Sequence, residues 1–133
     1  ICMNQTEFKF TRSSIINGKI FAIDWLYKNK YKFKPVINKI FRGDTFTLDI
    51  NHYNTIINNI EFIYNDSDCH WAETDGTKIW INIWNDTNRW TQELLNYTIT
   101  HECLHGLIKR KGKYYTSEYK EHIIMGNIDK KLI

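Results

Sequence analysis

The sequence has little proline, glycine or cysteine, and no long apolar run. One proline, Pro35, and six glycines leave no linker that would divide the chain. Three scattered cysteines, Cys2, Cys69 and Cys103, do not form a disulfide framework, so a reducing compartment is expected. No apolar run approaches the roughly 18 residues of a membrane span, and the first residues lack the layout of a signal peptide. We therefore expect a cytoplasmic protein without a membrane segment.

The remaining composition is that of a globular chain. Apolar residues make up 42% of the sequence and aromatic residues 15%, which excludes general disorder. The 133 residues suit a single domain spanning 1–133 with one core. The net charge of +3 is compatible with nucleic acid or another anionic partner but requires neither.

Period-two alternation of apolar and polar residues predicts a small sheet of three or more strands in the middle of the chain. Turn-rich stretches separate the alternating segments, such as T-D-G-T before Lys78. The three segments are Thr45–Ile50, Ile60–Tyr64 and Lys78–Trp84.

The amino-terminal portion, residues 1–39, is of uncertain structure. Ile20–Tyr27 is apolar and short, which suits either a helix or a strand. Lys28–Lys34 alternates lysine with aromatic or polar residues and is interpreted as a solvated connection.

Two helices are predicted after the strands. The first runs from about Thr91 to Lys109, because its apolar residues recur at helical spacing. The second begins near Thr116 or Ser117, both good caps, and runs to about Met125. Strands followed by helices indicate an α+β domain with the helices packed on one face of the sheet.

The first of these helices carries the sequence H-E-C-L-H at residues 101–105, an HExxH match. His101 and His105 lie one turn apart on one side of a helix, so both imidazoles can bind one Zn²⁺. Glu102 lies about 100° around the helix, where it can activate a metal-bound water without binding the metal. The alternative is an exposed helix with two solvated histidines. We favour zinc because Leu94, Ile99 and neighbouring apolar residues indicate a buried helix.

A zinc site of this kind needs a third protein ligand. The extended HExxHxxGxxH pattern is excluded, because the sequence has Ile108 and Lys111 at the two remaining positions. The ligand is therefore expected from the last helix. Glu121 is favoured, because it shares a stripe with apolar residues that would face the HExxH helix. Glu118 and His122 stay open as alternatives.

With H-E-C-L-H followed by a glutamate in E-H-I-I-M, the chain resembles the gluzincin metallopeptidases, and its small size resembles the archaeal minigluzincins. The resemblance covers about residue 78 to the carboxyl terminus. It implies that Lys78–Trp84 is the edge strand along which a peptide or unfolded protein substrate binds. It also implies a monomer or weakly self-associating enzyme, with latency if residues 127–133 block the cleft.

Two alternatives to a peptidase follow from other residues. The basic, partly aromatic segments Lys28–Lys34 and Lys109–Lys113 would suit a nucleic-acid or protein binding module stapled by zinc. A peptidase fold without activity, kept for binding a partner, is the second alternative.

Other reactive residues receive modest interpretations. Cys103 is expected to be a buried, small apolar side chain, and Cys69-His70 to be part of a loop without function. Trp80 and Trp84 suit a substrate pocket and packing under a loop equally well.

Overall fold

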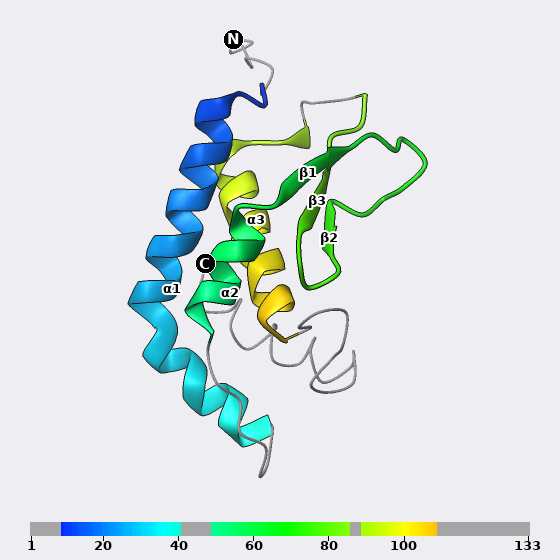
Figure 1. Cartoon of the computed structure of the whole chain (residues 1–133). Coiled ribbons are helices and arrows are strands. Elements are labelled where there is room, and N and C mark those ends of the chain that lie inside the picture. The colour runs from blue at the N-terminus through cyan, green and yellow to red at the C-terminus, as the bar shows by residue number, and fades with distance from the viewer. Residues whose placement is uncertain (1–8, 41–48, 86–88, 109–133) are drawn as a thin grey trace, which may run out of the picture.

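Three helices and a three-stranded sheet make up the described part of the chain. A computed structural model of the protein describes residues 9–40, 49–85 and 89–108. The elements in chain order are α1 (Arg12–Ile40), α2 (Ile50–Ile57), β1 (Ile60–Ile63), β2 (Ala72–Thr74), β3 (Ile79–Asn82) and α3 (Gln92–Ile108) (Figure 1). The expected α+β class is confirmed.

The sheet is mixed, with β3 between β1 and β2. β1 runs parallel to β3, with Ile60 opposite Ile79, and β2 runs antiparallel to it. A tight turn joins β2 to β3: Gly76 has a φ of 93°, which glycine adopts without strain. The carboxylate of Asp75 accepts hydrogen bonds from the backbone N–H groups of Thr77 and Lys78. The T-D-G-T stretch is thus a turn, as its composition predicts.

The position of β3 corrects one expectation. The segment Lys78–Trp84 was predicted to be the edge strand, but β3 is flanked on both sides and β1 and β2 form the edges among the described strands. The reason is that β2, only three residues long, pairs with the far side of β3. A strand of three residues has too little alternation to be recognised in the sequence.

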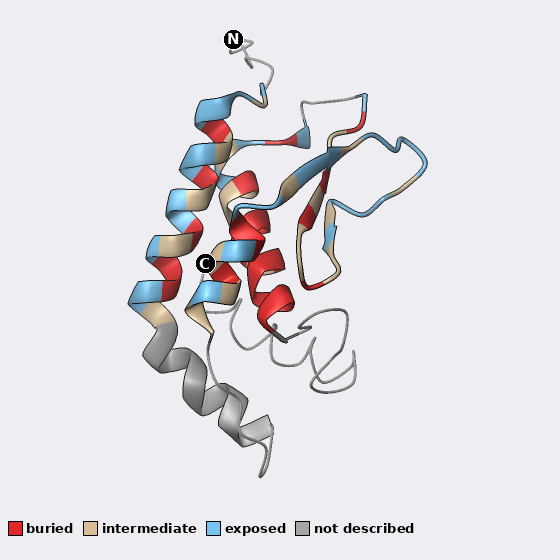
Figure 2. Cartoon of the chain, in the orientation of Figure 1, coloured by how far each residue is buried: buried red, intermediate tan, exposed pale blue. Residues whose placement is uncertain are grey.

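Helix α3 is the centre of the described structure. It contacts α1 and α2 as well as β2 and β3, and it lies between α1 and the sheet (Figure 1). Figure 2 shows buried residues along most of its length, whereas the part of α1 coloured by burial alternates between buried and exposed positions. The fully buried residues Leu95, Ile99 and Leu104 of α3 join Ile79 and Ile81 of β3 in one core.

Two polar contacts and a close approach fix the helices relative to one another. The Tyr53 hydroxyl on α2 donates to the Ala22 carbonyl on α1 at 2.7 Å. The Gln92 amide at the start of α3 donates to the Ser14 carbonyl on α1 at 3.0 Å. A Cβ on Gly18 of α1 would lie 2.5 Å from Ile99 Cδ1, so glycine permits this approach.

The amino-terminal half differs from its prediction in two places. Ile20–Tyr27 is helical, and so is Lys28–Lys34, because α1 continues to Ile40. The interpretation of 28–34 as a connection is therefore wrong; lysine is a good helix former, and local polarity alone does not end a helix.

The prediction of a strand at Thr45–Ile50 is wrong for its last two residues, Asp49 and Ile50. The Asp49 side chain accepts a hydrogen bond from the His52 N–H and caps α2, which begins at Ile50. Residues 45–48 lie outside the described residues. Within the described segments, no helix has the length and apolar character needed to cross a membrane.

Candidate functional site

The HExxH residues lie in the carboxyl-terminal half of α3, as predicted. The helix begins after Thr91, whose hydroxyl accepts a hydrogen bond from the Leu94 N–H at 3.1 Å. This cap satisfies one of the donors that a helix start leaves without a backbone partner. The helical register then places His101 and His105 one turn apart.

The two imidazoles point toward each other. His105 Nε2 and His101 Nε2 are 3.0 Å apart, and the ring centroids are separated by 4.6 Å. The His105 side chain is buried, whereas His101 is half-buried, so the pair opens toward the surface on the His101 side. Two nitrogens at this distance form a hydrogen bond when one carries the proton and the other a lone pair.

The donor set fits a zinc ion. Two nitrogens bound to one tetrahedral zinc at 2.0–2.1 Å lie about 3.3–3.4 Å apart. The observed separation of 3.0 Å needs only a few tenths of an ångström of opening to reach that value. Small rotations of the two imidazoles on a fixed helix are sufficient.

Glu102, which follows His101 in the helix, is buried, with a relative exposure of 9%. It does not form a three-ligand cluster with the two histidines: among the described residues, such a cluster occurs only at Asp68, Cys69 and His70. The Glu102 carboxylate therefore does not converge with the two imidazoles on one point.

The other residues predicted for this site follow α3 in the chain. Glu121, the favoured third ligand, and the alternatives Glu118 and His122 lie outside the described residues. So does the tail 127–133.

Cys103 is completely buried between the two histidine positions, which confirms its expected packing role. Burial raises the pKa of its thiol well above the ordinary value of 9.0, and the neighbouring Glu102 adds to the effect. Burial likewise raises the pKa of Tyr53, with a further contribution from Cys103. Both groups are therefore neutral in the folded protein at physiological pH.

Gly106 lets α2 approach α3 immediately after the HExxH residues. A Cβ at this position would lie 2.5 Å from Ile56 Cδ1, which is far inside normal contact. Ile56 is fully buried, so the interface behind His105 is packed by hydrocarbon. The part of α3 that carries the histidine pair thus packs against a buried apolar residue of α2.

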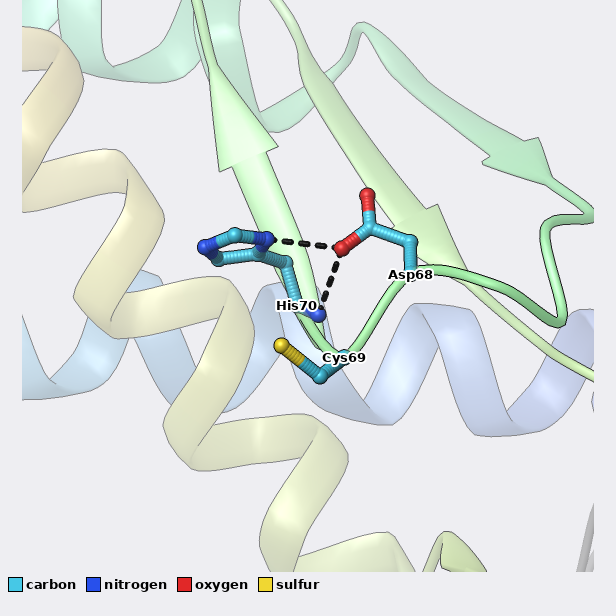
Figure 3. Close-up of side chains that lie close together, drawn as sticks. All are labelled: Asp68, Cys69 and His70. Atoms are coloured by element: carbon cyan, nitrogen blue, oxygen red, sulfur yellow. Dashed lines mark hydrogen bonds and ion pairs between the residues drawn. The ribbon is translucent and has the colours of Figure 1, made fainter.

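A second group of chemistry-bearing residues lies in the loop between β1 and β2. One ligand atom each from Asp68, Cys69 and His70 lies within 4.8 Å of the other two (Figure 3). Asp68 Oδ1 accepts from the His70 N–H at 2.8 Å and is 2.7 Å from His70 Nδ1. These bonds lower the pKa of Asp68, so the carboxylate is ionised at neutral pH. Cys69 and His70 are exposed.

Cys69 and His70 stand out in the sequence as adjacent metal-ligating residue types, whereas Asp68 does not. The available signal was D-x-H spacing, because an aspartate often accepts a hydrogen bond from the backbone two residues later.

One buried amide holds this loop. Asn82 Oδ1 accepts from the N–H groups of Asn65 and Trp84, and Nδ2 donates to the carbonyls of Asn65 and His70, at 3.1–3.4 Å. All four hydrogen-bonding positions of the amide are used. Trp84 Nε1 donates to the Asp68 carbonyl at 2.7 Å. The loop backbone is thereby fixed on both sides of Cys69.

The two tryptophans left open by the sequence have distinct surroundings. Trp84 is buried, packs edge-to-face with Trp71 at 4.9 Å, and lies under the loop. Trp80 is half-buried, and its Nε1 donates to Glu61 Oε2 at 3.1 Å. For Trp84, packing under a loop is therefore the correct alternative.

No family model, curated protein or solved structure matches the chain. Any functional conclusion must come from its own residues.

Proposed function

We propose that the protein is a zinc-dependent metallopeptidase of the minigluzincin kind. The observation that carries the proposal is the 3.0 Å separation between the Nε2 atoms of His101 and His105 on one helix. Histidines on an exposed helix would turn outward to water, whereas this pair converges and His105 is buried. A converging pair of nitrogen donors is the arrangement that zinc binding requires.

Each residue of the motif then has a distinct role. His101 and His105 hold the metal, and Glu102 accepts a proton during hydrolysis of the peptide bond. Zinc, when bound, lowers the pKa of a coordinated water to about 7 and polarises a carbonyl. The position of Glu102 in the motif, directly after the first histidine on a buried part of α3, supports its role.

We assign the third ligand to Glu121, with Glu118 and His122 as alternatives. The motif supplies two nitrogen donors, and catalytic zinc sites use three protein ligands. A carboxylate from the segment after α3 would complete the His₂Glu set.

The substrate is proposed to be an extended peptide or unfolded protein that pairs with β2. β2 is an edge among the described strands and contacts α3, whereas β3 is covered on both sides. A peptide added to β2 would form backbone hydrogen bonds beside the HExxH helix.

Metal content and hydrolysis test the proposal together. The HExxH site should keep about one tightly held zinc per chain, since structural and catalytic zinc sites bind a single ion. His101→Ala should lose this zinc. Glu102→Gln should retain it and hydrolyse an unfolded casein-like substrate about 10²–10⁴-fold more slowly, the usual contribution of general base catalysis.

Glu93→Gln is the matched control, because Glu93 is exposed in the first turn of the same helix. It should leave both properties unchanged. Equal activity of Glu102→Gln and the unmodified protein would exclude the peptidase mechanism. Zinc bound by the unmodified protein, with no hydrolysis of the substrate by that protein, would favour the zinc-stapled binding module.

A further inference from the structure

We propose that Asp68, Cys69 and His70 form a second metal site, for a borderline-soft divalent ion such as Zn²⁺. The site lies in the loop between β1 and β2 and shares no residue with the HExxH motif. The proposal therefore does not depend on the proposed peptidase function.

The spacing of the three side chains is close to that of a zinc site. Donor atoms around a tetrahedral zinc lie about 3.3–3.6 Å apart, given Zn–S near 2.3 Å and Zn–N or Zn–O near 2.0–2.1 Å. Here the ligand atoms are all within 4.8 Å, and the Asp68 and His70 atoms are 2.7 Å apart. Side-chain rotations that move the ligand atoms by about 1 Å would bring all three to bonding distance from one zinc ion. In Figure 3 the carboxylate faces the imidazole, and the sulfur lies below the ring.

The backbone that carries these side chains is already fixed. Asn82 holds the His70 carbonyl, and Trp84 holds the Asp68 carbonyl. Both anchoring residues are buried, at 1% and 2% exposure. Binding an ion therefore does not require the loop to be ordered first, which removes much of the entropic cost of binding.

The donors select the class of ion. A thiolate and an imidazole favour Zn²⁺ and Co²⁺ over Mg²⁺ and Ca²⁺, which prefer oxygen donors. Asp68 supplies a negative charge beside them. Because Cys69 and His70 are exposed, water can complete the coordination and the ion can exchange.

Cobalt titration distinguishes this site from the HExxH site. A thiolate bound to Co²⁺ gives a near-ultraviolet charge-transfer absorption, whereas the nitrogen and oxygen donors of the HExxH site do not. Titration of the reduced full chain with Co²⁺ should give this absorption, saturating at one ion per chain. His101→Ala should give the same absorption, so loss of the peptidase site and loss of this site are separately detected. Zn²⁺ should abolish the absorption, and Mg²⁺ should not.

Three variants complete the test. Cys69→Ser should lose the absorption, whereas the matched control Cys2→Ser should keep it. Asp68→Asn should weaken Co²⁺ binding by about tenfold or more, because loss of even an outer-shell partner of a metal site typically costs about 10–100-fold in affinity. Far-ultraviolet circular dichroism shows whether each variant is folded. Absence of the absorption in the unmodified chain, or its persistence in folded Cys69→Ser, would overturn the proposal.

Discussion

At the scale of single residues, Asn82 shows how one side chain can determine a local structure. Its amide is buried and uses all four of its hydrogen-bonding positions on Asn65, His70 and Trp84. Nothing in the sequence distinguishes it from the many other asparagines. The hydrogen bonds of this amide form only when β3 and the loop between β1 and β2 come together in the fold. The sequence alone therefore does not predict the role of Asn82.

Replacing this amide should be costly. Asn82→Asp keeps the shape but removes two donors and places a carboxylate among carbonyl oxygens. We expect a loss of about 3 kcal/mol in the free energy of unfolding at neutral pH, typical of a buried charge without a partner. Urea denaturation measures the change.

The control for this prediction is Asn59→Asp. Asn59 is exposed, so its stability should change by less than about 0.5 kcal/mol. Equal effects of the two substitutions would show that the Asn82 hydrogen bonds do not stabilise the fold.

The histidine pair was predictable because it depends on one helix alone. An i, i+4 spacing determines which face two residues share, and the surrounding apolar residues determine that a helix forms. Asp68 depends instead on the path of a loop, and its contact with His70 follows from a turn that local periodicity does not encode.

At the scale of elements, α3 is the best predicted and α2 the least. The predicted helix from Thr91 to Lys109 matches α3, Gln92–Ile108, nearly to the residue. Helix α2 has eight residues, too few for a clear helical period, and its cap Asp49 lies in a stretch that alternates like a strand. Short elements thus escaped prediction because packing, rather than local sequence, stabilises them.

The contact of α2 with α3 should depend on Gly106. Gly106→Ala gains about 1 kcal/mol of helix propensity, but its Cβ would overlap Ile56 Cδ1, and overpacking costs about 1–3 kcal/mol. We therefore expect a net loss of about 1 kcal/mol in the free energy of unfolding.

A double-mutant cycle with Ile56→Val isolates this contact, because valine lacks the clashing Cδ1. The double variant should be more stable than the sum of the single changes predicts, by about 1 kcal/mol. Additive effects in urea denaturation would contradict the packing that the structure describes.

At the scale of the whole molecule, two buried acids among the described residues should make stability depend on pH at high pH. The pKa values of the Cys103 thiol and the Tyr53 hydroxyl are raised by burial. The unfolded chain ionises these groups at ordinary values of 9.0 and 10.0, while the folded chain keeps them protonated. The unfolded state then binds fewer protons, so stability is present below pH 9 and falls as pH rises.

The free energy of unfolding is expected to fall by about 1.4 kcal/mol per pH unit for each group that remains protonated in the folded protein and is ionised in the unfolded chain. Cys103→Ala should reduce the slope between pH 9 and 10 by that amount, whatever its effect at pH 7. Thermal or urea unfolding at several pH values measures it. An unchanged slope would mean that the Cys103 thiol ionises equally in both states.

The α+β class and two of the three strands were predictable, because alternation and helical spacing are local properties. The order of the strands was not. Which neighbour a strand takes depends on long-range packing, so the expectation that Lys78–Trp84 forms an edge was wrong.

The central position of β3 has a consequence for synthesis on the ribosome. β1 emerges first, yet its neighbour in the sheet, β3, is made only after β2 and the intervening loop. Until then the backbone donors and acceptors of β1 lack the strand with which they pair in the described sheet. A nascent chain with such an edge is open to wrong partners, so this protein should benefit from a chaperone during translation more than its small size suggests.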